Sequence, residues 1–224
     1  MEPGFGAFGK MPALGDFFRL RVSAGFIVGW DPWLQGAMID ARAALGDRFD
    51  DCYMTAPVWR FTLRPGVAGA AGLIGVMMPS VDRVGRKYPL TLVAEMDMPS
   101  AFRTHFRQSA VFDALEALAL DSLGDDMTRE TLAEGLAAIS LLPDLPAGRL
   151  DRAGSTVVMT QAAPEMLAAD LAIASDGSMN CASIWSSCVD GRARIMIRDG
   201  MPQADQVIGL FDLEAPIWVE QVYA

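Results

Sequence analysis

The residues with the most chemical potential lie in one short stretch, "PSVDRVGRKYPLTL", which runs from Pro79 to Leu92 between two apolar runs. It carries one carboxylate and three cationic side chains, namely Asp82, Arg83, Arg86 and Lys87. The fork of an arginine guanidinium suits a carboxylate or a phosphate, and so predicts a recognition loop. The only other lysine of the chain, Lys10, lies in a second polar stretch, "GKMPALGD".

The same stretch also fits a purely structural role. Ser80 is placed to cap a turn after Pro79, and Asp82 is close enough to Arg86 in a tight loop to form an ion pair. Gly85 allows the left-handed backbone that reverses a chain. Composition and patterning alone do not decide between a recognition loop and a charged turn.

The other reactive side chains give weaker signals. His105 is the only histidine and lies in a helical pattern, which favours a structural histidine over a catalytic one. Cys52, Cys181 and Cys188 have no CxxC spacing, so they predict ordinary thiols in a reducing compartment and no metal site. The sequence has neither a GxxxxGK[ST] motif nor a strand-GxGxxG-helix motif, and we expect no cofactor.

Composition limits the classes of partner. The chain has 224 residues, of which 52% are hydrophobic and 21% charged, and its formal net charge is −10. An acidic chain whose largest basic cluster is Arg83, Arg86 and Lys87 disfavours binding to nucleic acids and to anionic membranes. The first ten residues do not resemble a signal peptide, and the apolar run from Val67 to Met78 is too short to span a bilayer. These features predict a cytoplasmic protein that meets a basic surface on another protein.

Hydrophobic spacing predicts the elements that position these residues. Apolar residues at helical spacing predict a helix that begins near Asp31, with Pro32 in its first turn, and ends at Gly46. Alternation over residues 59–63 predicts a half-buried strand, and residues 72–80 and 88–96 predict two central strands. The charged stretch connects these two strands. The glycine-rich start of the chain predicts a short edge strand and a structured loop.

The second half of the chain predicts mainly helices and a hairpin. Residues 101–124, 127–142, 164–174 and 203–212 show helical spacing, residues 143–155 a loop, and residues 156–160 a strand. Asp190-Gly191 predicts a hairpin turn between two further strands. We therefore expect one α/β domain of the α+β type over residues 1–224, with an antiparallel or mixed central sheet flanked by helices.

Four motifs in the first hundred residues resemble the TagF family, also called ImpM, of proteins associated with the bacterial type VI secretion system. They are "FGKMPALGDF", "WDPWLQ", "APVWRFTL" and "PSVDRVGRKYPLTL". The motif positions expected to support the fold are Pro12, Gly15, Trp30, Asp31, Trp33, Trp59, Phe61, Pro79 and Pro89. Family members often carry two adjacent tryptophans in a late strand, whereas here Trp185 is followed by Ser186. The motifs lie in residues 1–100, and residues 101–224 resemble the family only in length and coarse pattern.

The resemblance implies a cytoplasmic accessory protein without established catalysis. Members of the family act as post-translational negative regulators of the apparatus by binding a scaffold protein with an FHA domain, sometimes beside a phosphatase. The implied fold is an α/β sandwich similar to longin or profilin-like domains. A homo-oligomer is compatible with the sequence.

Two functional hypotheses follow. The first is a binding module whose contact surface combines the two polar stretches, with Gly9, Lys10, Asp16, Ser80, Asp82, Arg83, Gly85 and Arg86. The alternative is a small phosphate- or nucleotide-binding protein or enzyme that uses Lys10, Asp16, Asp82, Arg83 and Arg86 around a phosphate, although a phosphate loop and a general base are missing from the pattern.

Overall fold

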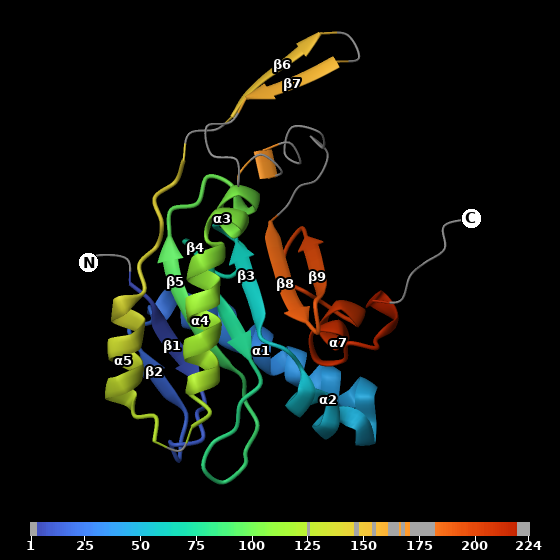
Figure 1. The fold of residues 1–224 in the computed structure, drawn as a ribbon. Coiled ribbons are helices and arrows are strands. Elements are labelled where there is room, and N and C mark those ends of the chain that lie inside the picture. Colours follow the sequence, from blue (N-terminus) through green and yellow to red (C-terminus); the bar gives the residue numbers. More distant parts are fainter. Residues whose placement is uncertain are drawn as a thin grey trace.

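A computed structural model describes residues 4–124, 126–145, 148–153, 156–160, 166, 169–170 and 182–218. Its centre is a seven-stranded sheet in the order β2-β1-β5-β4-β3-β8-β9, in which every neighbouring pair is antiparallel (Figure 1). These strands are β1 (Gly6–Gly9), β2 (Phe18–Leu20), β3 (Trp59–Leu63), β4 (Gly72–Met78), β5 (Leu90–Met96), β8 (Ser183–Val189) and β9 (Arg192–Arg198). Two further strands, β6 (Arg149–Ala153) and β7 (Thr156–Thr160), form a separate hairpin.

Helices cover both faces of the sheet, which confirms the predicted α+β class (Figure 1). They are α1 (Ala24–Leu45), η1 (Gly46–Arg48), α2 (Phe49–Thr55), α3 (Ala101–Arg107), α4 (Ser109–Asp121), α5 (Arg129–Ala138), α7 (Asp205–Phe211) and η3 (Pro216–Trp218). Helices α1, α2 and α7 pack on one face, and α3, α4 and α5 on the other. Within the described part of the chain, none of these helices has the length and apolar character to cross a membrane.

The central strands are buried on both faces. Strand β4 is buried along its whole length, with Leu73 and Met77 in the core under α1 and with Ile74 and Val76 in the core under α4. The prediction of a half-buried β3 is wrong, because α3 packs on the face that carries its polar residues, including the buried Thr62. On the same face, the Arg60 side chain bonds to Asp113 and Glu116 of α4. The sheet is therefore the middle layer of the molecule, with one layer of helices packed on each face.

The first helix begins earlier than its Asp-Pro signal predicts. Ser23 is the N-cap of α1, since its hydroxyl accepts a hydrogen bond from the Phe26 amide at 3.0 Å. Pro32 therefore lies inside the helix, and Asp31 is no cap. The predicted end is confirmed, because Gly46 is the C-cap of α1.

The remaining elements confirm some of the sequence predictions and differ from others. The β8–β9 hairpin through Asp190-Gly191 is confirmed, with positive φ angles of 51° and 72° at these residues. The predicted helix 101–124 is split at Gln108 into α3 and α4. Part of the predicted loop 143–155 is strand β6, and β1 lies between β2 and β5, so the edge strand is β2. Most of the predicted helix 164–174 lies outside the described residues.

Candidate functional site

The two polar stretches meet at one end of the sheet. Strand β1 pairs with β5, so the β1–β2 connection (residues 10–17) and the β4–β5 connection (residues 79–89) lie side by side at the lower end in Figure 1. We call their junction the loop clasp, defined by the side chains of Lys10, Asp82, Arg83 and Arg86 and by the carbonyl groups of Ala13 and Gly15.

The centre of the loop clasp is the carboxylate of Asp82, whose side chain is fully buried. Its Oδ2 accepts from Lys10 Nζ at 2.9 Å and from Arg86 Nε at 2.6 Å, which confirms the predicted Asp82–Arg86 pair. Its Oδ1 accepts from the amides of Val84 and Arg86 at 3.1 and 2.9 Å. Burial raises the pKa of this carboxyl, but the hydrogen bonds from Lys10, Arg86 and Val84 outweigh burial and hold the pKa well below its usual range.

The cations of the loop clasp also bind main-chain oxygens across the junction. Arg83 Nη2 donates to the Ala13 carbonyl at 2.6 Å, and the Arg83 amide donates to the Leu14 carbonyl at 3.0 Å. Arg86 Nη2 donates to the Gly15 carbonyl at 2.9 Å. These bonds hold the two connections together as one rigid unit.

Two glycines are required by the backbone of this junction. Gly9 has a φ of 130°, and a Cβ atom there would lie 2.1 Å from the Pro89 carbonyl oxygen. Gly85 has a φ of 82°, which confirms the predicted left-handed position. Pro12 occupies the second position of a turn that is closed by the Leu14 amide bonding to the Met11 carbonyl at 3.0 Å.

The predicted cap at Ser80 is wrong. Among the described residues, its buried hydroxyl has no hydrogen-bond partner. The main chain of Ser80 binds Tyr53 instead, since the Tyr53 hydroxyl donates to the Ser80 carbonyl at 2.7 Å and accepts from its amide at 2.9 Å. Burial raises the pKa of Tyr53, so this phenol stays protonated. The sequence pattern did not predict Tyr53 as a partner of Ser80, because Tyr53 lies 27 residues away in α2.

The tip of the loop clasp faces solvent. Val84 is 71% exposed and stands between Arg83 and Arg86, which are also exposed, as is Gly85. Asp16 is exposed on the neighbouring connection, where its Oδ1 accepts from the Phe17 amide at 2.8 Å. Val84 was not singled out from the sequence, because single apolar residues are common on protein surfaces.

The aromatic motif residues belong to the core, as expected. Trp30, Trp59 and Phe61 are fully buried, and Trp33 is partly buried against the same cluster. Each indole N–H of the three motif tryptophans is bonded: Trp30 to Thr91 Oγ1, Trp33 to the Pro202 carbonyl and Trp59 to the Leu210 carbonyl. Trp185 stacks on Trp30, with ring centroids 6.0 Å apart.

Asp31 and Pro89 link this core to the loop clasp. The Tyr88 hydroxyl donates to Asp31 Oδ1 at 2.5 Å, so α1 holds the residue that precedes Pro89. Pro79 and Pro89 bracket the connection between β4 and β5.

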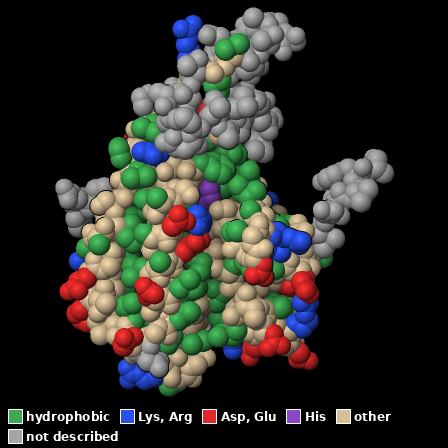
Figure 2. Space-filling model, viewed as in Figure 1, with side chains coloured by type: hydrophobic (Ala, Val, Ile, Leu, Met, Phe, Trp, Pro, Cys, Tyr) green, Lys and Arg blue, Asp and Glu red, His purple; other side chains and the backbone are tan. Residues whose placement is uncertain are grey.

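His105 has a structural environment. It is 4% exposed, and its two ring nitrogens share hydrogen bonds with Thr62 Oγ1 at 2.9 Å and with Ser186 Oγ at 2.8 Å. Figure 2 shows only a small part of this ring, the single histidine of the chain, at the surface. Burial and, to a smaller extent, the charge of Arg60 lower the pKa of His105 to about 3. An imidazole this difficult to protonate is a poor general base at neutral pH.

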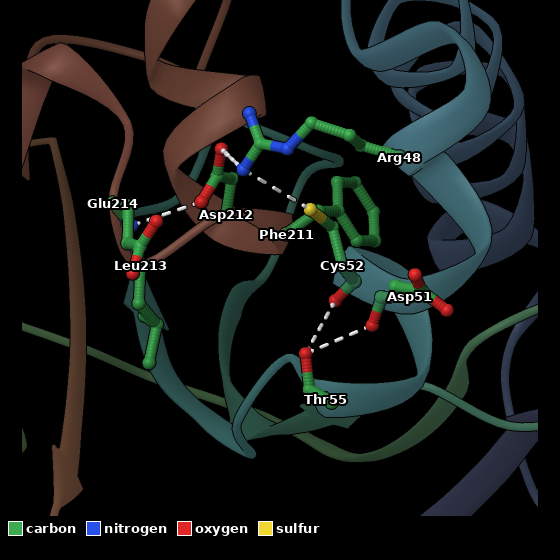
Figure 3. A pocket seen from close by; sticks show the side chains of 8 residues that line it. All are labelled: Arg48, Asp51, Cys52, Thr55, Phe211, Asp212, Leu213 and Glu214. Carbon is green, nitrogen blue, oxygen red and sulfur yellow. Dashed lines mark hydrogen bonds and ion pairs between the residues drawn. The ribbon is translucent and has the colours of Figure 1, made fainter.

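A separate cavity of about 350 Å³ opens between α2 and the segment after α7 (Figure 3). Its lining residues are Arg48, Asp51, Cys52, Thr55, Phe211, Asp212, Leu213 and Glu214. Arg48 Nη2 donates to Asp212 Oδ2 at 3.0 Å and to Cys52 Sγ at 3.7 Å. Burial and the charge of Asp212 raise the pKa of Cys52, so the thiol is not activated. Across the ranges given above, no group of three or more His, Cys, Asp or Glu residues is placed to hold a metal ion.

Comparisons with known proteins relate this architecture to one family. The model of the type VI secretion system-associated TagF N-terminal domain matches residues 6–139, which include all four sequence motifs. The crystal structure of PA0076 from Pseudomonas aeruginosa PAO1 is similar, with a TM-score of 0.76 and 27% sequence identity. The match covers 98% of this chain and 98% of that chain. A comparison with curated proteins found no match.

Proposed function

Because the chain belongs to the TagF family of type VI secretion system-associated proteins, we propose that it is a non-enzymatic, cytoplasmic negative regulator of that apparatus. It acts after translation by binding an FHA-domain scaffold component. The whole chain serves as one TagF-like domain, and the exposed tip of the loop clasp contacts the partner.

The observation that supports this proposal is the contrast between the base and the tip of the loop clasp. Buried Asp82 fixes the backbone beneath an apolar side chain, Val84, that is 71% exposed between two arginines. A preorganised loop loses little conformational entropy on binding, and arginine is enriched among the residues that dominate binding energy at protein interfaces.

The geometry supports protein binding over the phosphate alternative. Lys10 is bonded to Asp82 and to the Arg86 carbonyl, and Arg83 and Arg86 are bonded to carbonyls of the facing loop. A phosphate would have to displace these acceptors and would meet the Asp82 carboxylate behind them. Main-chain atoms and Val84 leave a surface better suited to another protein.

The test is a binding measurement with the purified FHA-domain scaffold of the same secretion system. Val84→Ser is expected to weaken the affinity by roughly tenfold or more, the effect of losing one hot-spot side chain. Val28→Ser is the matched control, because Val28 is 76% exposed on α1 and lies outside the loop clasp. Its affinity should equal that of the wild type.

Two results would refute parts of the proposal. Equal binding by Val84→Ser and the wild type would remove the loop clasp from the interface. No binding of the scaffold by the folded wild type would refute the partner itself. In cells, Val84→Ser should also fail to repress secretion when it replaces the wild type, whereas Val28→Ser should repress normally.

A further inference from the structure

Strand β9 ends the sheet on the side opposite β2 and is the outermost strand at the right of the sheet in Figure 1. It pairs with β8 through a two-residue turn, and Val189 lies opposite Arg192. In such a hairpin the residues next to the turn form a hydrogen-bonded pair, and these pairs recur at every second residue. The amides and carbonyls of Ala193, Ile195 and Ile197 therefore point away from β8.

The side chains of β9 divide sharply between the two faces of the sheet. Arg192, Arg194 and Arg198 lie on the face of Met196, which packs in the core under α1. The other face carries Ala193, Ile195 and Ile197. Ile195 is 45% exposed, and Ile197 packs only partly against the small cluster at α3.

The three arginines lack acceptors in the described part of the chain. None of their guanidinium groups forms an ion pair or a hydrogen bond there, and the Nε atom of Arg198 is buried without a partner. This is notable in a chain with a formal net charge of −10, where carboxylates outnumber cations. A buried guanidinium nitrogen without an acceptor is costly.

We infer that the outer edge of β9, which pairs with no strand in the described part of the chain, binds an extended acidic segment of another protein, which adds to the sheet as an eighth strand. Main-chain bonds to residues 193, 195 and 197 supply the register. In the added strand, side chains alternate between faces, so carboxylates meet the arginines on one face while apolar residues cover Ile195 on the other. The ligand is therefore a segment of alternating acidic and apolar residues.

A second copy of this chain fits the edge poorly. Antiparallel pairing of two β9 strands around Ile195 would place Arg192 directly opposite Arg198 of the other copy, twice in each dimer. Like charges directly opposite each other in a sheet are destabilising. The charge pattern therefore selects an acidic partner. This surface is separate from the loop clasp, so the inference does not depend on the proposed regulatory role.

The test is selection of a phage-displayed random ten-residue peptide library on the full-length protein. Ile195→Pro removes one outward amide and leaves the β8 ladder intact, since proline is tolerated on edge strands. Ile195→Thr is the matched control, because it keeps the amide and suits a strand. Wild type and Ile195→Thr should both enrich peptides with alternating acidic and apolar residues. The affinity of the best peptide should fall by roughly tenfold or more in Ile195→Pro, a loss of about 1.4 kcal/mol.

A second variant keeps the test independent of the proline. The double change Arg192→Glu and Arg194→Glu should reverse the selection, so that alternating basic and apolar peptides are enriched instead. Three outcomes would overturn the inference: enrichment without an acidic pattern, equal binding by Ile195→Pro, and a dimer in sedimentation velocity that Ile195→Pro abolishes. The last would assign the edge to a second copy.

Discussion

The loop clasp and the β9 edge both carry arginines, but the two regions use them differently. In the loop clasp, Arg83 and Arg86 bind internal acceptors, and the centre of the network is the buried carboxylate of Asp82. At the β9 edge, Arg192 and Arg194 have no such acceptor among the described residues. One region has its charges satisfied by folding, and the other presents them for a partner.

The difference shows what decides the role of an arginine. A buried carboxylate is tolerated only when cations and amides surround it, so Asp82 commits Lys10 and Arg86 to the fold. An edge strand without a buried carboxylate makes no such demand. The presence of a buried acceptor therefore separates a structural arginine from one that is available for recognition.

The largest predicted effect comes from breaking the loop clasp at its centre. In Asp82→Ala, Lys10 and Arg86 lose their shared acceptor, and two amides lose theirs. We expect the loss of stability to match that of the core truncation Leu92→Ala, for which about 2–5 kcal/mol is typical. Urea unfolding of both variants and the wild type measures the two losses in unfolding free energy.

The control for this prediction is Asp16→Ala in the facing connection. Asp16 is exposed and, among the described residues, bonds only to the adjacent amide, so its removal should change the unfolding free energy by less than about 0.5 kcal/mol. If Asp82→Ala were as mild as Asp16→Ala, the loop clasp would not stabilise the fold.

Asp82 of the loop clasp and the buried His105 should affect the stability of the protein over different pH ranges. The folded protein keeps His105 neutral down to about pH 3, whereas the unfolded chain binds its proton below about pH 6.5. Stability should therefore fall by about 2 kcal/mol from pH 7 to pH 5. The pKa of Asp82 is instead lowered, so its contribution is fully present above the unfolded value of about 3.9 and is lost only below it.

The variant His105→Gln sharpens this comparison. It removes the titrating group, so the slope of stability between pH 7 and pH 5 should vanish even if the variant is less stable at every pH. Chemical denaturation at a series of pH values gives both curves. A slope that survives in His105→Gln would assign the acid sensitivity to another group.

Much of the fold was predictable because local patterns carry it. The apolar runs of β4 and β5, the hairpin turn at Asp190-Gly191 and the glycine at the end of α1 each have a short-range cause. Pro32 led to a wrong predicted start for α1, since an Asp-Pro pair suits a helix start but here lies inside a long helix. The packing of α3 on β3 cannot be read from the alternating pattern of β3.

The candidate sites were predictable to different degrees. The Asp82–Arg86 pair spans four residues, so spacing suffices to predict it. The bonds from Lys10 and Tyr53 cross 72 and 27 residues, and only the pairing of β1 with β5 and the packing of α2 bring those groups to the site. The free edge of β9 depends on strand order, which a single sequence does not reveal.

Hydrogen exchange should distinguish the two regions at the level of single amides. The amides of Val84 and Arg86 bind Asp82, whereas the outward amides of Ala193 and Ile195 face solvent in the described structure. The first pair should exchange at least about tenfold more slowly, equivalent to about 1.4 kcal/mol of protection. Mass spectrometry with overlapping peptides measures the exchange rates of these amides. Equal protection would mean that the β9 edge is already covered in the free protein.

The smallest effect on stability is expected at the β9 edge itself. In Arg192→Ala/Arg194→Ala, no described acceptor is lost, so the unfolding free energy should change by less than about 0.5 kcal/mol. Aggregation measured by light scattering should nevertheless rise, because charged side chains protect a free edge from pairing with other strands. Arg83→Ala is the matched variant, since it loses the 2.6 Å bond to the Ala13 carbonyl and should cost about 1 kcal/mol. If the β9 variant lost as much stability as Arg83→Ala, the edge arginines would have acceptors within the chain, and the distinction between the two regions would disappear.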